Sequence, residues 1–121
     1  MRDHTRLRAF ELADRVAVAV YGLTSCFPRE EIYGLTAQIR RAAVSVPSNI
    51  VEGCTRDSQA DYLRFLHIAY GSLKELHYQL DLSIRLGFLH KNDFLQTEPL
   101  IIEAEKVLNG LLRSIRTDIE K

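Results

Sequence analysis

Apolar side chains recur every three or four residues along most of the chain, which is the spacing of amphipathic helices. The clearest block runs from Ser58 to Leu86. Ser58 followed by Asp61 is a variant of the capping box that opens a helix, and Gly87 is a natural C-terminal stop. Apolar residues between them form the seam of a helix bundle or coiled coil. The seam residues are Tyr62, Leu66, Ala69, Leu73, Leu76, Leu80 and Ile84.

Isolated glycines and prolines divide the rest of the chain into three more helical blocks. We expect helices over about 8–26 and 35–53, with a tight turn or short helical piece at 28–34. The last helix begins at an Asn92 cap, and Pro99 bends it or postpones its start. The inward residues expected on these helices are Phe10, Ala13, Ala17, Val20, Leu23, Leu35, Ile39, Ala42, Val46, Ile50, Phe94, Ile101, Ala104, Leu108, Leu111, Ile115 and Ile119.

Short connections between four helices make successive helices antiparallel neighbours. The sequence therefore predicts an all-α fold, an up-and-down four-helix bundle, with no convincing strand. A chain of 121 residues fits one domain, residues 1–121, and 46% hydrophobic and 26% charged residues are ordinary globular values. Pro47 lies inside the second helix and removes one backbone donor, so we expect a kink where the carbonyl of Ala43 loses its partner.

Two of the helices carry more apolar surface than one bundle needs. The run VAVAVY at 16–21 is apolar around the whole helix, and Phe65, Ile68 and Tyr78 lie off the seam of the third helix. One interpretation is a wide core stripe with singly exposed apolar side chains. The other is a second face that docks on neighbouring subunits. The surplus favours the second interpretation, a homo-oligomer.

The charges of the chain balance, with 16 Lys and Arg against 16 Asp and Glu. This balance argues against a generalised attraction to nucleic acid or anionic lipid. The first fifteen residues lack the apolar region of a signal peptide, and no apolar run approaches the roughly 20 residues of a membrane span. Cys26 and Cys54 lack metal or redox spacing, so we expect free thiols in a reducing compartment, the cytoplasm, and no membrane partner.

No group of side chains in the sequence predicts catalysis. A di-iron bundle needs Glu-x-x-His on two helices, and none of the four histidines has a Glu three residues before it. His67 and His77 are too far apart along a helix to share a metal, so we interpret the histidines as surface or interface residues. Neither cysteine has a base close in sequence, and the glycines form no phosphate loop. We expect no enzyme activity, no metal and no cofactor.

Arginine provides twelve of the sixteen cations and is well suited to forked contacts with phosphate or carboxylate. The candidate contact residues form three groups, Arg40 with Arg41, Arg56 with Arg64, and Arg113 with Arg116. Glu52, Asp57 and Asp61 are interleaved with the first two groups. Salt bridges within or between subunits and a phosphate-contacting patch both remain open.

Two long stretches of the sequence strongly resemble the four-helix bundle protein family, also called S23 or 23S rRNA intervening-sequence proteins. They are FPREEIYGLTAQIRRAAVSVPSNIVEG at 27–53 and LRFLHIAYGSLKELHYQL at 63–80. The resemblance implies a bundle that assembles as a homopentameric ring, which would cover the surplus apolar faces. Relatives that serve as accessory proteins of diversity-generating retroelements bind nucleic acid and a reverse transcriptase through a markedly basic surface. This chain departs from those relatives because its net charge is zero.

Within the first stretch, one set of residues has a structural interpretation: Pro47, Ser48, Asn49 and Glu52. The Ser48-Asn49 pair can satisfy the open backbone carbonyl, and we expect Glu52 to meet Arg40 or Arg41, within the chain or between subunits. The first functional hypothesis is a non-enzymatic homopentameric scaffold that contacts RNA or DNA through the arginine groups. The second is an adaptor for a protein partner, a reverse transcriptase or another protein, without nucleic-acid contact.

Overall fold

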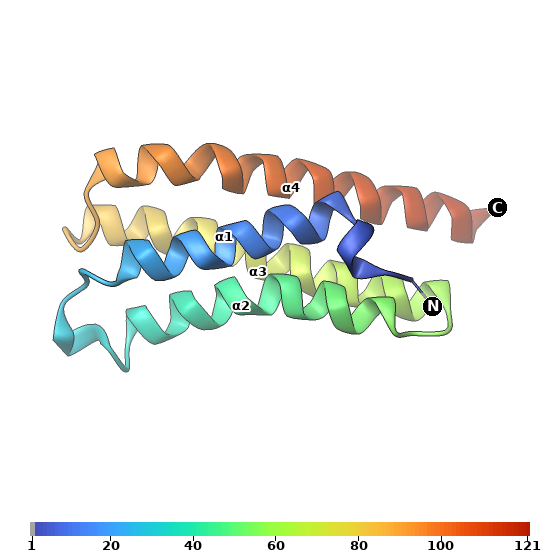
Figure 1. The fold of residues 1–121 in the computed structure, drawn as a ribbon, viewed down its shortest axis with the longest axis horizontal. Coiled ribbons are helices and arrows are strands. Elements are labelled where there is room, and N and C mark those ends of the chain that lie inside the picture. The colour runs from blue at the N-terminus through green and yellow to red at the C-terminus, as the bar shows by residue number, and fades with distance from the viewer. Residues whose placement is uncertain (1) are drawn as a thin grey trace.

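A computed structural model describes residues 2–121, and it is all α, with no strand among those residues. The four main helices run antiparallel to their sequence neighbours, and the beginning and the end of the chain lie at the same end of the molecule (Figure 1). The predicted four-helix fold is confirmed. The elements in chain order are the 3-10 turn η1 (His4–Arg6), α1 (Arg8–Thr24), the 3-10 turn η2 (Arg29–Glu31), α2 (Leu35–Cys54), α3 (Gln59–Arg85) and α4 (Lys91–Glu120).

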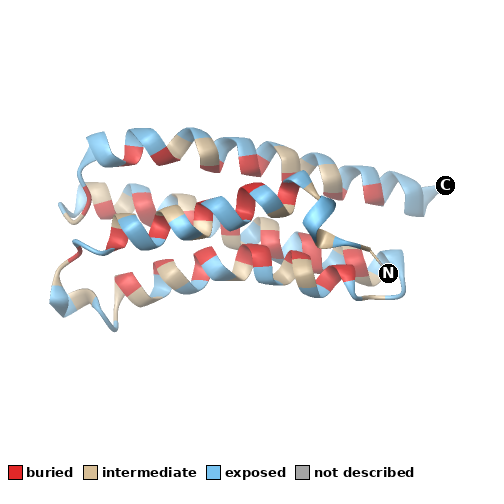
Figure 2. Cartoon of the chain, in the orientation of Figure 1, coloured by how far each residue is buried: buried red, intermediate tan, exposed pale blue. Residues whose placement is uncertain are grey.

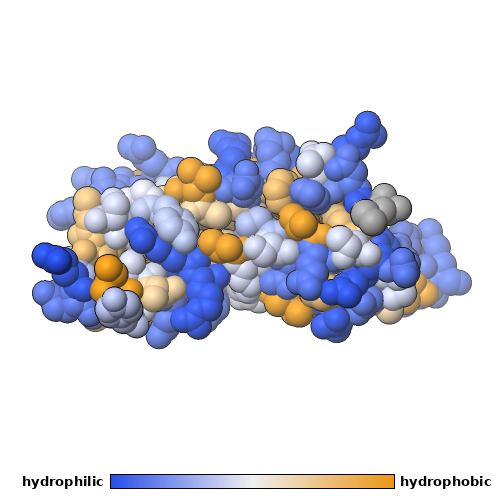
Figure 3. All heavy atoms as spheres, turned by 60° about the horizontal axis from the view of Figure 1, so that its bottom comes forward, coloured by the Kyte–Doolittle hydropathy of each residue, from blue (hydrophilic) through white to orange (hydrophobic). Residues whose placement is uncertain are grey.

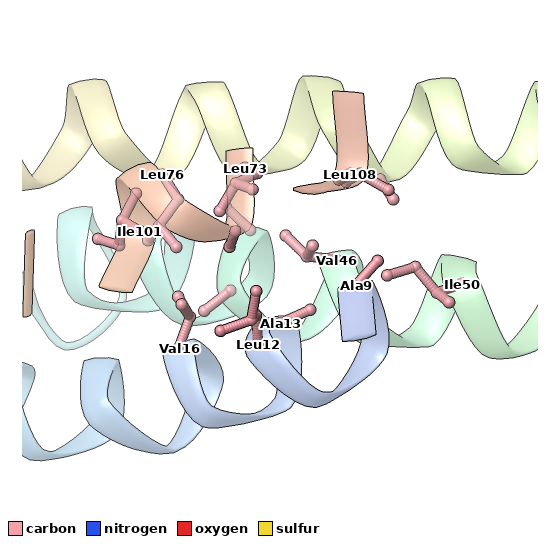
Figure 4. Packing of buried hydrophobic residues seen from close by; sticks show 14 of the residues in the cluster. Ala9, Leu12, Ala13, Val16, Val46, Ile50, Leu73, Leu76, Ile101 and Leu108 are labelled. Carbon is pink, nitrogen blue, oxygen red and sulfur yellow. The ribbon is translucent and has the colours of Figure 1, made fainter. Parts of the chain in front are cut away.

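The helices form a closed cycle of neighbours. α2 packs on α1 and α3, and α4 packs on α3 and α1, so α2 and α4 are diagonal to each other. Each helix turns a buried stripe towards the centre (Figure 2). Side chains from all four helices meet there (Figure 4). The labelled core residues are Ala9, Leu12, Ala13, Val16, Val46, Ile50, Leu73, Leu76, Ile101 and Leu108.

Six of the seven seam residues predicted for α3 are buried, and the seventh, Ile84, is partly buried. The central residues of the seam, Leu66, Leu73 and Leu80, have no exposed surface. The helix begins as predicted, because Ser58 Oγ accepts a hydrogen bond of 3.1 Å from the backbone N–H of Asp61. Gly87 follows the helix with φ of 81°, a conformation that L side chains rarely adopt, so glycine suits this stop.

The inward face of α1 differs from the prediction. Leu12 and Val16 are fully buried at its centre, whereas Phe10, Ala17 and Leu23 are only partly buried. The sequence could not define this face sharply, because an apolar run around the whole helix satisfies several rotations equally well. The contacts with α2 and α4 decide the rotation.

The start of α4 also differs from the prediction. Its cap residue is His90, which makes no side-chain capping bond, so Asn92 is not the cap. Pro99 lies inside the continuous helix. Near the other end, Leu112 is buried and Ile119 is exposed, so the core stripe ends before the last turn.

The two cysteines lie at opposite ends of the bundle. Cys26 follows α1 and is exposed, whereas Cys54 closes α2 and is buried, and both are free thiols. None of the helices formed by residues 2–121 is long and apolar enough to cross a membrane.

Candidate functional site

The six candidate arginines do not form one patch in a single chain. Arg40 and Arg41 lie near the start of α2, and Arg56 follows its last residue, Cys54. At about 1.5 Å per residue, fourteen residues of helix separate Arg40 from Cys54 by about 21 Å. Arg64 near the start of α3 and the arginines near the end of α4 share the end of the bundle at which Arg56 lies (Figure 1).

Arg56 and Arg64 both stack on one aromatic ring beside the α2–α3 turn. Their guanidinium carbons lie 4.6 Å and 4.5 Å from the centre of the Phe65 ring. Phe65 was expected among the surplus apolar residues off the seam, yet only 7% of its surface is exposed. Cation–π contacts of this kind hold a guanidinium in place and cover the ring. Phe65 therefore belongs to the core and supports both arginines.

Carboxylates neutralise these two arginines. Glu52 Oε1 lies 2.9 Å from Arg56, and Asp61 lies 3.1 Å from Arg64 and 3.9 Å from Arg56. Within the chain, then, the expectation that Glu52 meets Arg40 or Arg41 is wrong. Glu52 and Arg56 are one helical turn apart on the same side, whereas Arg40 and Arg41 lie about three turns away. Arg56 and Arg64 are therefore used largely in ion pairs within the molecule.

The beginning of the chain packs over the same turn. The guanidinium of Arg2 lies 4.1 Å from the centre of the Tyr62 ring and donates hydrogen bonds to the carbonyl of Arg56, at 2.7 Å, and to the side chain of Gln59. Burial raises the pKa of Tyr62 to about 12, and burial also raises the pKa of the Cys54 thiol. Both groups are therefore neutral near pH 7, and Cys54 is a poor nucleophile there. No pattern in the sequence indicates this role of Arg2.

Arg40 and Arg41 have different surroundings although they are adjacent. Arg40 Nε donates a hydrogen bond of 2.8 Å to Thr24 Oγ1, and its guanidinium stacks on the Tyr21 ring at 4.5 Å. Arg40 thus joins α2 to the end of α1. Arg41 is exposed and lines a shallow cavity of about 160 Å³ between α2 and α3.

The polar residues around Pro47 work differently from the prediction. Asn49 Nδ2 donates to the carbonyl of Ser45 at 2.8 Å and to its hydroxyl at 2.9 Å, so the amide does not serve Ala43. The hydroxyl of Ser45 also lies 2.9 Å from that of Ser72 on α3, and Ser48 is exposed. Asn49 therefore stabilises the helix two residues beyond the expected carbonyl and orients a contact between α2 and α3.

Arg113 and Arg116, like Arg40 and Arg41, have no carboxylate partner among the described residues, and unlike Arg40 both are fully on the surface. Among residues 2–121, no acidic group lies within ion-pair distance of either guanidinium. Arg116 instead lies 3.1 Å from Nε2 of His67 on α3, one turn after Arg64. These side chains are exposed, so they can meet a phosphate without breaking a salt bridge.

Two further places collect titratable groups. A cavity of about 360 Å³ at the end of α1 is lined by Cys26, His90 and Asp93, residues that the sequence did not bring together. His77, expected at a surface or interface, lies between α3 and α4 with only 22% of its side chain exposed and contacts Glu98 and Glu105. Residues 2–121 contain no cluster of three or more histidine, cysteine or acidic side chains arranged to hold a metal ion.

Exposed apolar side chains gather on separate faces of the bundle. Val18 on α1 is 70% exposed, and Val44 on α2 is 42% exposed. On the outer side of α4, Leu95 is 54% and Ile102 is 37% exposed, with the exposed Pro99 between them. Hydrophobic atoms interrupt the polar surface on the face that contains α2 (Figure 3).

Comparison with known proteins supports the resemblance found in the sequence. The model of the 23S rRNA-intervening sequence protein family matches residues 5–110. The chain is also similar to a crystal structure from Bacteroides thetaiotaomicron VPI-5482, of a protein with unknown function from the S23 ribosomal protein family. That match has a TM-score of 0.78 and 25% sequence identity, and it covers 86% of this chain and 97% of the other. No curated protein matches the chain. Because the family model spans most of its length, the chain belongs to the 23S rRNA-intervening sequence protein family.

Proposed function

We propose that this protein is a non-enzymatic homo-oligomeric scaffold, a pentameric ring, that contacts RNA or DNA through Arg113 and Arg116. The observation that carries the proposal is the exposure of apolar side chains on two faces of a bundle whose core is already complete. The working compartment is the cytoplasm, where the free thiols of Cys26 and Cys54 would stay reduced.

A ring needs two different contact surfaces on each subunit, because each copy touches one neighbour with each surface. Suitable candidates are the exposed Val18 on α1 with Val44 on α2, and the α4 face with Leu95 and Ile102. Val44 and the α4 face lie on different sides of the bundle, since α2 and α4 are diagonal, whereas Val18 is on α1, which neighbours both. A head-to-tail contact between the two surfaces would bury side chains that a monomer leaves in water.

Nucleic-acid contact is the second part of the proposal. Arg113 and Arg116 have no carboxylate partner among residues 2–121, and His67 lies beside Arg116. A ring would repeat this group once per subunit. Several weak phosphate contacts would then add up even though the chain has a formal net charge of zero.

The assembly can be tested by analytical ultracentrifugation at micromolar concentration. We expect the wild type to sediment as an oligomer and Val18→Lys and Ile102→Lys to shift it towards the monomer, because each places a charge in an apolar contact. Ile119→Lys, at an exposed site near the end of α4, is the matched control and should leave the oligomer intact. A wild-type particle of 13.9 kDa would refute the assembly proposal.

Nucleic-acid binding can be tested separately by fluorescence anisotropy with labelled RNA and DNA at two salt concentrations. The affinity should fall as salt rises, and Arg113→Gln with Arg116→Gln should weaken binding and reduce the salt dependence by about one unit of slope per lost contact. Arg8→Gln is the control, because Arg8 is already paired with Glu11 and Glu103. Absence of binding at low salt would favour the alternative, an adaptor for a protein partner such as a reverse transcriptase.

A further inference from the structure

His77 lies between two carboxylates that belong to the neighbouring helix. Its Nδ1 is 2.8 Å from Glu105 Oε2, and its Nε2 is 3.1 Å from Glu98 Oε2. The imidazole therefore extends from α3 to two points of α4 that are about two helical turns apart. The ring also packs at 6.2 Å, edge to face, on Phe94 in the first turns of α4.

This geometry requires a particular protonation state. A neutral imidazole has one N–H donor and one nitrogen lone pair, whereas the imidazolium has two donors. A carboxylate can only accept a hydrogen bond, so a ring with both nitrogens at hydrogen-bond distance from carboxylates fits the imidazolium. With a neutral ring, one of the two contacts would place a lone pair against a carboxylate oxygen.

The charges around His77 balance when the ring is protonated. Lys74, one turn before His77, lies 3.5 Å from Glu105, so two cations face two carboxylates. The other charged groups nearby are occupied elsewhere. Asp81, one turn further along α3, pairs with Arg85, and Glu75 turns to Gln79. On α2, which also packs on α3, Arg40 contacts Thr24 and Tyr21, and Arg41 lines a cavity with Glu75.

Pro99 gives this contact a mechanical role. The proline follows Glu98 directly and has no backbone N–H, so the ladder of α4 lacks one donor at this position. The carbonyl that loses its donor is that of Leu95, so the weakened turn covers residues 95–99, with Glu98 at its end and Glu105 in the continuous helix beyond it. A bridge from His77 to both residues therefore holds the segment before Pro99 in line with the rest of α4.

We propose that His77 is a pH-dependent clamp between α3 and α4, which holds residues 91–98 in place as the imidazolium and releases them when the ring loses its proton. Glu98 would separate first, because 38% of its side chain is exposed against 11% for Glu105, so water can replace its contact. The neutral ring would keep its Nδ1–H on Glu105. The start of α4 and the turn before it would then be free to open.

The direction of the pH effect follows from the surroundings of the ring. Burial disfavours the charged form, but the hydrogen bonds to Glu105 and Glu98 outweigh burial and raise the pKa of His77 above its ordinary value. The folded state therefore binds this proton more tightly than the unfolded chain. The resulting stability is fully present below the ordinary histidine pKa of about 6.5 and is lost as pH rises through the folded pKa.

The direct test is NMR titration of the histidine rings in the wild-type protein. Both ring nitrogens of His77 should be protonated at pH 6.5, and its pKa should exceed that of histidine in a short peptide. Each unit of difference corresponds to a tenfold effect on the folding equilibrium. A pKa at or below the peptide value, or a single-donor tautomer at pH 6.5, would refute the clamp.

Hydrogen exchange tests the opening itself. After correction for intrinsic rates, amides at 91–98 should exchange faster at pH 8.5 than at pH 6, while those of α2 should not. Glu98→Ala, which removes the partner of His77 Nε2, should make exchange at 91–98 similarly fast at both pH values. His67→Gln, on α3 like His77, should behave like the wild type. Equal protection of residues 91–98 at both pH values in the wild type would overturn the proposal.

Discussion

The arginines beside the α2–α3 turn and those near the end of α4 lie at the same end of the bundle but differ in their surroundings. Arg56 and Arg64 stack on Phe65 and pair with Glu52 and Asp61. Arg113 has no carboxylate partner among the described residues, and its neighbour on the same face, Arg116, contacts only a histidine. Equal numbers of arginines thus give a nearly neutral surface in one region and a positive one in the other.

Helical spacing explains much of this difference. Glu52 precedes Arg56 by four residues and Asp61 precedes Arg64 by three, so each pair meets on one side of a helix. On the last turns of α4, Asp118 lies nearest to Lys121, at 4.0 Å. A count of charges therefore indicates little about a phosphate surface until the ion pairs within the molecule are known.

The largest expected effect on stability comes from removing the Phe65 ring, on which Arg56 and Arg64 stack. Phe65→Ala should lower the free energy of unfolding by about 3–5 kcal/mol, because it leaves a cavity and removes the surface on which Arg56 and Arg64 stack. Urea denaturation provides the measurement. Ile68→Ala, 41% exposed on the same helix, is the control and should cost far less. Similar losses for both variants would contradict a core role for Phe65.

A smaller effect contrasts the packing of the two regions. A Cβ at Gly53 would lie 2.9 Å from Phe65 Cβ, and this overlap should destabilise Gly53→Ala by about 1–3 kcal/mol. The higher helix propensity of alanine should offset about 0.5–1 kcal/mol of that loss. Nothing lies within 4 Å of a Cβ at Gly110, near Arg113, so Gly110→Ala should stabilise by about 0.5–1 kcal/mol. Thermal melting should show opposite shifts. A stabilising Gly53→Ala would show that the close approach of α2 and α3 relaxes easily.

The smallest effect concerns the exposed charges. Arg64→Gln should cost at most about 1 kcal/mol, because it removes an exposed ion pair and a stacking contact, and the loss should shrink with added salt. Arg116→Gln should change the stability by no more than about 0.5 kcal/mol. Denaturation at low and high salt distinguishes the two. A larger loss for Arg116→Gln would mean that this residue stabilises the fold and is not free to bind a ligand.

The fold was predictable wherever the apolar residues define a single face of a helix. Most of the α3 seam and its Ser58 cap were correct because apolar residues are densest along one line of this helix, although Phe65 beside that line also proved to be buried. The predicted inward face of α1 was rotated from the observed one, because the run 16–21 is apolar on every side of the helix. The cap of α4 was misplaced because Asn92 is a favourable cap residue, whereas the helix begins after His90 without any side-chain cap. Packing against other helices decides the rotation of α1 and the start of α4.

The candidate site was less predictable, because its contacts join residues that are distant in sequence. The arginine groups could be identified, but the partners of Arg40, Thr24 and Tyr21, depend on how α1 lies against α2. The contact of His77 with Glu98 and Glu105 depends on the register of α3 against α4. The sequence shows two glutamates seven residues apart on α4. Without the register of α3 against α4, this spacing does not identify His77 as their partner.

The cycle of neighbouring helices also has a consequence for the order of folding. Three of the four helix pairings join segments that are adjacent in the chain, and only the pairing of α1 with α4 connects its two ends. Local pairings cost little loop-closure entropy, and bundles of low contact order fold in microseconds to milliseconds. The hairpins α1–α2, α2–α3 and α3–α4 can therefore form early, and the contact of Arg8 with Glu103 would report the final closure.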